Sequence, residues 1–365
     1  MDSNSYRMAN LANKSFSEIL SDGFKLFFQI YRTIILPLIL FQVILIILDV
    51  FLFTDFRFQI DSLGITANEI MEDLVGGTPL SESESNILSS FIYMSIALFF
   101  LQNLLGAIII TIAMCSVSNY VFKRYMKEDI SFIESFKSAF NKKILLVILI
   151  IGICLPISFL LFIPAIIVFG FYIFLVFTYN MKDNKIKDNQ NPIKEAREIA
   201  RGAFWKIIGI FIINVIFISI ISFIYSFIID IAINADSPSF IAKSNSWYDP
   251  ATRNYGMLIL FQIIYSIIDI VFAPLWICLL TALFSSLNAK RNLKLQAQYE
   301  YYPTRRFYQE QYPQPQESYG VGENNVPRPI AQIEKNFYCP FCGHFISSPK
   351  KFCPKCGESL SFMSE

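Results

Sequence analysis

The sequence contains few charged residues and a single histidine. Of its 365 residues, 16% are charged and 54% are apolar, whereas soluble domains have about 25% charged residues. This composition, with its positive mean hydropathy, indicates a membrane protein. The single His344 excludes histidine-rich metal sites and most histidine-dependent catalysis. A net charge of +1 excludes an overall basic field that would attract nucleic acid.

Motifs of several enzyme classes are also missing. The sequence contains no His-Glu-x-x-His, Gly-x-Ser-x-Gly, Gly-x-x-x-x-Gly-Lys-Ser/Thr or Gly-x-Gly-Asp motif. Residues 1–30 lack the basic start, apolar centre and small-residue cleavage site of a signal peptide. We therefore expect no enzymatic activity, and we expect the first membrane span to act as the targeting signal.

Long apolar runs fill most of residues 33–286. The plainest is 144–181, which contains no charged residue. As one helix this run would be about 55 Å long, whereas the hydrocarbon core of a bilayer is about 30 Å thick. The run therefore predicts two spans joined by a tight turn near Pro156 and Pro164.

Together the runs predict an all-α multi-pass membrane bundle of six transmembrane helices. Residues 54–87 are rich in Asp and Glu and are expected to form a loop after the first span. The next run is long for one span and short for two. Two spans would put Lys123 and Arg124 on the side of the acidic loop, so one long tilted span is expected. The six expected spans are 33–53, 89–122, 144–162, 164–180, 207–229 and 257–286.

One unit recurs three times within residues 15–288: a capped amphipathic helix followed by two spans. Ser15–Glu18 and Ser131–Glu134 are capping boxes, in which the Ser and Glu side chains bind free N–H groups at a helix start. The third copy begins at Asn191-Pro192, an N-cap residue followed by proline at the first helical position. The repeat predicts three hairpins packed as one bundle, each with an amphipathic helix in the same membrane interface.

The distribution of Lys and Arg predicts the orientation in the membrane. Nearly all of them lie before the first span, between the second and third, between the fourth and fifth, and after the sixth. The opposite segments hold only Arg57, Lys243 and Arg253. Because positive residues collect on the cytoplasmic side, both termini are expected there. The even number of spans agrees, and the expected location is a prokaryotic plasma membrane.

Two segments carry a resemblance to a known family. Residues 191–208 read Asn-Pro-Ile-Lys-Glu-Ala-Arg-Glu-Ile-Ala-Arg-Gly-Ala-Phe-Trp-Lys-Ile-Ile, and residues 272–276 read Phe-Ala-Pro-Leu-Trp. Over residues 15–288 the chain resembles the membrane domain found beside glycerophosphodiester phosphodiesterases and related six-span families of bacteria and archaea. The resemblance implies a six-span fold. It does not extend to the hydrolase domain, whose histidines and metal-binding carboxylates have no counterpart in this sequence.

The C-terminus contains two matched Cys-Pro-x-Cys-Gly segments. Their four thiolates suit a tetrahedral Zn2+ ion, and a closed four-sulfur shell leaves no position for a substrate. Residues 338–360 resemble the zinc-ribbon family, so the zinc is expected to be structural and His344 to be exposed. A redox-active dithiol remains the alternative interpretation of either pair. The expected ligands are Cys339, Cys342, Cys353 and Cys356.

The remaining segments complete the predicted organisation. Residues 1–14 are polar and expected to be disordered, and residues 289–335, rich in Tyr, Gln and Pro, are expected to be a flexible linker to a ribbon at 336–361. Ribbons bind protein or nucleic acid. The basic face of this one is small and is offset by Glu358, so a protein partner, bound through the ribbon or the linker, is expected rather than nucleic acid. Three lone cysteines in apolar runs are expected to be buried structural thiols: Cys115, Cys154 and Cys278.

Asp269 is the most notable polar residue within the expected spans. It lies about 18 Å into the last span, where a carboxylate costs about 2.5–3.5 kcal/mol and should face the bundle interior or a water-filled cavity. Asp49 and Asp230 fall nearer the span ends and are expected to be hydrated. Asp269 is expected to form an interhelical hydrogen bond, with a proton or cation path as the alternative interpretation. Polar side chains that could partner Asp269 in an intramembrane site are Gln262, Gln102, Asn103 and Asn119.

Two functions remain open from the sequence. The first is a membrane scaffold or adaptor, in which the bundle lies in the lipid bilayer and the tethered cytoplasmic ribbon binds a protein partner. The second is a transporter or channel-like protein with Asp269 in its path. The adaptor hypothesis predicts a lipid-tight apolar bundle around Asp269, whereas the transport hypothesis predicts a polar cavity that reaches it.

Overall fold

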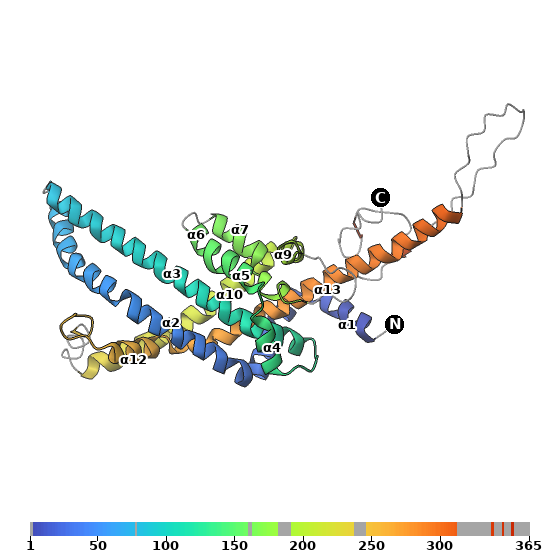
Figure 1. Cartoon of the computed structure of the whole chain (residues 1–365), viewed down its shortest axis with the longest axis horizontal. Helices are drawn as coiled ribbons and strands as arrows, with labels where there is room; N and C mark the ends of the chain where they lie inside the picture. The colour runs from blue at the N-terminus through green and yellow to red at the C-terminus, as the bar shows by residue number, and fades with distance from the viewer. Residues whose placement is uncertain are drawn as a thin grey trace, which may run out of the picture. The chain divides into compact units, whose positions relative to one another are not determined.

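The computed structural model of the chain describes residues 3–76, 79–159, 163–181, 191–236, 246–311, 337–338, 345–346 and 352–353. The chain divides into two compact units. The larger is Phe16–Phe284, and the smaller combines Met1–Ser15 with Ser285–Glu365. Nearly all described residues are helical (Figure 1), which confirms the predicted all-α class.

Two long helices form a hairpin in the larger unit: α2 (Phe16–Val75) and α3 (Glu82–Tyr125) (Figure 1). α2 runs without a break from the first amphipathic segment through the first expected span and on to Val75. The loop expected at 54–87 is therefore wrong over most of its length. Its acidic residues are interleaved with apolar ones, and Ala67 and Ile70 are buried, so the segment packs as a helix.

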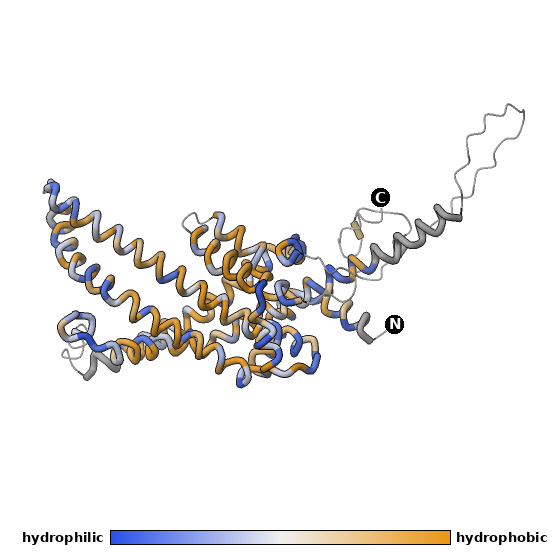
Figure 2. The backbone as a smooth tube through the Cα atoms, viewed as in Figure 1, coloured by the Kyte–Doolittle hydropathy of each residue, from blue (hydrophilic) through white to orange (hydrophobic). Residues whose placement is uncertain are grey.

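α3 is one continuous helix, as expected for a single long span. It begins at the complete capping box of Ser81 and Glu84, in which each residue's side chain pairs with the other's backbone N–H. Sixty and 44 residues correspond to about 90 Å and 66 Å of helix, so both helices are longer than a bilayer needs. Figure 2 shows the long apolar stretches of α2 and α3, with hydrophilic residues at the tip where they meet.

The uncharged run 144–181 forms a short helical hairpin. Its arms, 144–159 and 163–178, are each about 24 Å long, which is less than the thickness of a hydrocarbon core. In the first arm a π-helix precedes Pro156, which lacks a backbone N–H and clashes with the carbonyl four residues before it. The segments are α5 (Ile144–Val147), η1 (Ile148–Cys154), α6 (Leu155–Phe159), α7 (Ile163–Tyr172) and α8 (Leu175–Thr178).

The two later amphipathic segments are separate short helices, α4 (Phe132–Ala139) and α9 (Pro192–Ala200). At α9 the Asn191 side chain accepts the backbone N–H of Ile193, as its N-cap pattern predicts. α9 is followed by Gly202, whose φ of +80° only glycine adopts easily. The expected capping box at α4 does not form, because the Ser131 side chain makes no cap hydrogen bond.

The third hairpin joins α10 (Phe204–Asp236) to two consecutive helices, α12 (Tyr255–Tyr265) and α13 (Ile267–Gln311). The sixth expected span, 257–286, is therefore interrupted at Ser266, the C-cap residue of α12. This interruption lies three residues before Asp269.

Among the described residues, four helices are long and apolar enough to cross a membrane, rather than the six expected. A fifth is obtained if Phe132–Ala139 and Ile144–Ser158, bent by 68°, are counted as one span. The difference comes from the two short arms of 144–178, because the last expected span still counts as Ile267–Gln296 despite the break at Ser266. The four helices are Phe16–Glu72, Glu82–Tyr125, Phe204–Ile231 and Ile267–Gln296.

The first half of α13 forms the centre of the larger unit. Of its apolar stretch 61% is buried, compared with 11–22% in the other three long helices. The ring of Phe284 stacks on Phe177 with centroids 4.6 Å apart. Leu279 is buried directly against Gly23, where a Cβ atom would lie 2.7 Å from its Cδ2 and 3.0 Å from its Cα. Only glycine at position 23 allows α2 and α13 to approach this closely.

The smaller unit contains helix α1 (Ser3–Ala12) and a two-stranded antiparallel sheet. The helix occupies the segment that was expected to be disordered. α13 likewise continues to Gln311, into the expected linker, where Gln, Arg and Glu favour helix. The rest of the linker lies outside the described residues. The strands are β1 (Phe337–Tyr338) and β2 (Phe345–Ile346).

Gly23→Ala is expected to destabilise the larger unit, because overpacking of a well-packed contact costs about 1–3 kcal/mol. Gly106→Ala is the matched control, since a Cβ there meets nothing within 4 Å and alanine favours helix over glycine by about 1 kcal/mol. Thermal unfolding in detergent should show a lower midpoint for Gly23→Ala and an equal or higher one for Gly106→Ala. Equal midpoints for both variants would contradict the close contact.

Candidate functional site

A cavity of about 600 Å³ lies inside the larger unit. Its lining comes from one face each of α2, α3, α10 and the α12–α13 pair. On α12–α13 the lining residues are Gln262, Ser266, Asp269, Ala273 and Trp276, a spacing of three and four that keeps side chains on one side of a helix. The same spacing recurs on the other three helices, so the cavity follows the helix axes.

The cavity extends along the helices that line it. On α2 the lining runs from Leu38 to Asp49, to which the Arg57 side chain reaches back, and on α12–α13 from Gln262 to Trp276. At the rise of a helix these intervals correspond to about 16 Å and 21 Å. The cavity therefore covers more than half of a distance equal to the thickness of a hydrocarbon core.

One end of the cavity holds a neutral ion pair. The Arg57 guanidinium donates to Oδ2 of Asp49, which lies two turns earlier on α2, and the Gln102 side-chain amide of α3 donates to Oδ1 at 3.0 Å. Both carboxylate oxygens of Asp49 are thus hydrogen-bonded. The expectation that Asp49 is merely hydrated at a span end is replaced by a specific network that joins α2 to α3.

The middle of the cavity holds polar groups that lack partners. Asp269 lines the cavity and makes no hydrogen bond or ion pair with any residue that the structure describes. Asn214 on α10 also lines it and is only 8% exposed, yet its Oδ1 has no hydrogen-bond partner within the described part of the chain. A buried oxygen without a partner, such as that of Asn214, costs about 1–3 kcal/mol. The Asp269 carboxylate is exposed to the cavity and has no opposite charge beside it, so both groups favour a polar occupant.

The opposite end is aromatic. The rings of Phe211 and Trp276 meet edge to face with centroids 5.8 Å apart, and Phe169 of α7 stacks on Trp276 at 6.1 Å. Since α10 and α13 run in opposite directions, these rings lie at the end of the cavity away from Gln262. The cavity thus changes from polar to aromatic along its length.

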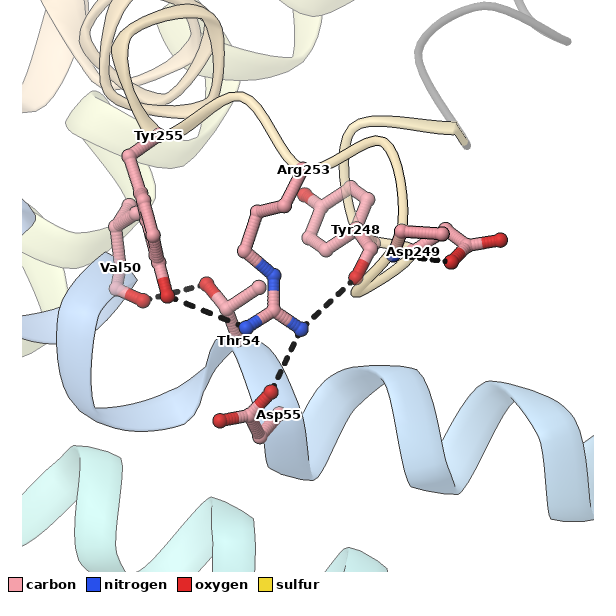
Figure 3. A network of polar contacts seen from close by, with 8 residues as sticks. Val50, Thr54, Asp55, Tyr248, Asp249, Arg253 and Tyr255 are labelled. Atoms are coloured by element: carbon pink, nitrogen blue, oxygen red, sulfur yellow. Dashed lines mark hydrogen bonds and ion pairs between the residues drawn. The ribbon is translucent and has the colours of Figure 1, made fainter.

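The segment 246–254, before α12, is fastened to α2 near the polar end of the cavity. Arg253 pairs with Asp55 Oδ1 at 2.6 Å and donates to the Tyr248 carbonyl and the Tyr255 hydroxyl, both at 3.2 Å (Figure 3). Hydrogen bonds to Tyr255 and Asp55 raise the pKa of Arg253 above its usual value. Beneath this network Trp247 and Leu258 pack with Val50 of α2.

Three of the four residues predicted to form an intramembrane polar site line this single cavity: Asp269, Gln262 and Gln102. Asn103 does not, because it follows Gln102 by about 100° around the helix; its side chain is exposed and donates to the Phe99 carbonyl at 2.7 Å. Asn119, also named as a possible partner of Asp269, donates to Ser138 instead.

Sequence reasoning missed Asn214 and Arg57. Asn214 is a single amide within the apolar run 207–229, which was a usable signal. Arg57 was assigned to a loop, so its position two turns beyond Asp49 on one helix was not recognised. Asp230, expected to be hydrated, accepts a hydrogen bond from the Tyr265 hydroxyl at 2.9 Å and lies outside the cavity.

Three of the four predicted zinc ligands, Cys339, Cys342 and Cys356, lie outside the described residues, as does His344. Cys353 is described and buried. β1 and β2 pair at Phe337–Ile346 and Tyr338–Phe345, so the first Cys-x2-Cys segment connects two paired strands. Among the described residues, no three His, Cys, Asp or Glu side chains form a group that could hold a metal ion. Four thiols with this spacing still suit zinc by their donor chemistry.

The lone cysteines differ in their surroundings. Cys115 and Cys278 are buried, as expected, whereas Cys154 is exposed. Cys154 ends the π-helix that precedes Pro156, and the outward face of this short hairpin is apolar, so an apolar run did not imply burial inside the protein.

No family model, curated protein or solved structure matches the chain. The resemblance to the membrane domain found beside glycerophosphodiester phosphodiesterases therefore stays a prediction.

Arg253→Gln is expected to make segment 246–254 less stable, because the substitution removes the ion pair with Asp55 and the hydrogen bonds to Tyr248 and Tyr255. Hydrogen exchange of the Thr252 and Asn254 amides, which bond to backbone carbonyls within the segment, should become faster. Arg253→Lys should not restore protection, since an ammonium cannot reproduce the planar fork. Asp55→Asn should have a smaller effect because Asp55 is 68% exposed. Unchanged exchange in Arg253→Gln would exclude this anchoring role.

Proposed function

We propose that the protein is an integral membrane transport protein whose solute path is the cavity between α2, α3, α10 and α12–α13. The observation that carries the proposal is the cavity itself, which extends along the helices, reaches Asp269 and contains unpartnered polar groups. It favours the transport hypothesis over the adaptor hypothesis, because a scaffold needs only an apolar bundle at this depth. The proposal assigns the chain no catalytic step.

The break at Ser266 supports this proposal. Interrupted helices near the middle of a membrane are costly in lipid and are tolerated where they line a cavity. In transporters such half-helices commonly provide solute and ion sites. Here the break lies between Gln262 and Asp269, both of which line the cavity.

The proposed orientation keeps both termini in the cytoplasm of a prokaryotic cell. If the short hairpin 144–178 crosses the membrane twice there are six spans, and if it enters and returns on one side there are four. Both of these arrangements are even and leave the basic segments on the same side. The proposed orientation therefore requires that the two arms of this hairpin either both cross the membrane or both return.

A second proposed function is protein binding by a C-terminal zinc ribbon. The specific observation in its favour is the strand pair that brackets Cys339 and Cys342, together with buried Cys353. Zn2+ held by Cys339, Cys342, Cys353 and Cys356 would stabilise a module too small to bury a sufficient core. The ribbon could regulate or localise the proposed transport activity from the cytoplasm.

Cys339→Ser is expected to lower the zinc content and unfold the ribbon without unfolding the larger unit. Metal analysis of the purified protein measures the first effect, and thermal unfolding in detergent measures the second. Cys154→Ser is the matched control, since its thiol lies outside the ribbon, and should retain zinc. Zinc content unchanged by Cys339→Ser, or loss of the whole protein from membranes, would contradict a separate zinc module.

Sided labelling tests the transport proposal. In Gln262→Cys, a membrane-impermeant charged thiol reagent is applied to right-side-out and inverted vesicles, and modification is measured at position 262 by peptide mass spectrometry. A path that opens to each side in turn should be labelled from both. Phe223→Cys is the control, because Phe223 is 74% exposed on the apolar surface of α10 and should face lipid, where the reagent does not enter.

Labelling of Gln262→Cys from one side only would indicate a binding pocket rather than a transport path. No labelling from either side would mean that water does not reach the cavity. Both results would contradict the transport proposal. Because modification is measured at position 262 itself, labelling of native cysteines does not contribute to the signal.

A further inference from the structure

The charges that line the cavity do not balance. Of the described lining residues, three are charged: Asp49, Arg57 and Asp269. Asp49 and Arg57 neutralise each other directly. Asp269 is left without a partner among the residues the structure describes, so the lining carries one net negative charge. Asp269 is exposed to the cavity, and its uncompensated charge favours a ligand with one positive charge.

Asn214 provides a second and independent indication of a ligand. Its side chain is more than nine-tenths buried and lines the same cavity, and its Oδ1, itself buried beneath the lining, has no hydrogen-bond partner among the described residues. A carboxylate and an amide oxygen are both acceptors, and a primary ammonium group carries three N–H donors. An ammonium group bound to Asp269 therefore retains N–H donors for the Asn214 oxygen, which becomes available when that amide turns toward the cavity.

The rest of the lining defines the remainder of the ligand. Pockets of about 300–1,000 Å³ suit small organic molecules, and the volume here is about 600 Å³. A metal ion would need more oxygen ligands than one carboxylate and a few amides, and would leave most of the cavity empty. Phe211 lies one turn from Asn214, and Trp276 lies two turns from Asp269, so an apolar body would extend toward the aromatic end.

We infer that the cavity binds a small organic cation with a primary ammonium head and an apolar body. Asp269 is the counter-ion and Asn214 an acceptor for the head, while Phe211 and Trp276 contact the apolar body. This inference rests on the proposed transport function, to which it adds the class of solute.

Three probes of similar chemistry separate the two parts of the ligand. 2-Phenylethylammonium has both head and body, 2-phenylethanol keeps the body without the charge, and ethylammonium keeps the charge without the body. Their affinities are measured by calorimetry on the full chain in nanodiscs of zwitterionic lipid, with empty discs subtracted. The ammonium with the phenyl body should bind at least about tenfold more tightly than either of the others.

Variants then assign the contacts. Asp269→Asn, which keeps the side-chain shape, should remove the preference for the ammonium over the alcohol, and Asn214→Leu should weaken ammonium binding while retaining the alcohol. Asp230→Asn is the matched control, since it neutralises a carboxylate outside the cavity and should leave all affinities unchanged. Each variant's thermal unfolding midpoint reports whether it is folded.

Equal affinities of the wild-type protein for 2-phenylethylammonium and 2-phenylethanol would overturn the inference, as would a preference that survives Asp269→Asn. Failure to bind any probe would overturn it as well. The sided labelling of Gln262→Cys does not depend on any of these binding results. A wrong assignment of the ligand can therefore be distinguished from a wrong assignment of transport function.

Discussion

A carboxylate in the first turn of α13, directly after the break at Ser266, constrains the rest of the larger unit. Asp269 cannot face hydrocarbon without a cost of about 2.5–3.5 kcal/mol, and no described residue neutralises it. The four cavity helices instead leave a space that Asp269 and Asn214 line. Further along α13 the helix is closely packed, and Gly23 lets α2 approach Leu279 there. Close packing in one part of α13 and an open polar face in another thus coexist on one helix.

The stabilising interactions are concentrated at the two ends of the cavity helices. At one end Phe284 stacks on Phe177 in the core around α13. At the other, Arg253 fastens segment 246–254 to Asp55 of α2, and Tyr265 bonds to Asp230 of α10. Between them, unpartnered groups line the cavity. This division is what the proposed function requires, because a solute path needs fixed walls and polar groups that remain available to the solute.

The sequence predicted much of this arrangement. Uncharged runs located the apolar helices, and depth in the last span identified Asp269 together with Gln262 and Gln102. The errors had physical causes. Acidic residues between 54 and 75 suggested a loop, although buried Ala67 and Ile70 continue a helix. Composition could not reveal that the arms of 144–178 are short, because a run without charge specifies neither where a chain turns nor how deeply it inserts. Asn103 was wrongly included in the predicted polar site, because depth in a span does not specify the direction in which a side chain points. The pairing of Arg57 with Asp49 was missed, because it depends on α2 continuing as a helix through residues expected to form a loop.

The central claim is that water, rather than lipid, occupies the cavity beside Asp269. A nitroxide attached to p-acetylphenylalanine introduced at position 266 reports this directly, because its collisions with a water-soluble nickel chelate and with lipid-soluble oxygen are measured by electron paramagnetic resonance. The account predicts that the nickel chelate dominates at position 266 and oxygen at position 223 on the outer face of α10. Dominance of oxygen at both positions would mean that lipid surrounds the break at Ser266, and would contradict a solute path through the bundle.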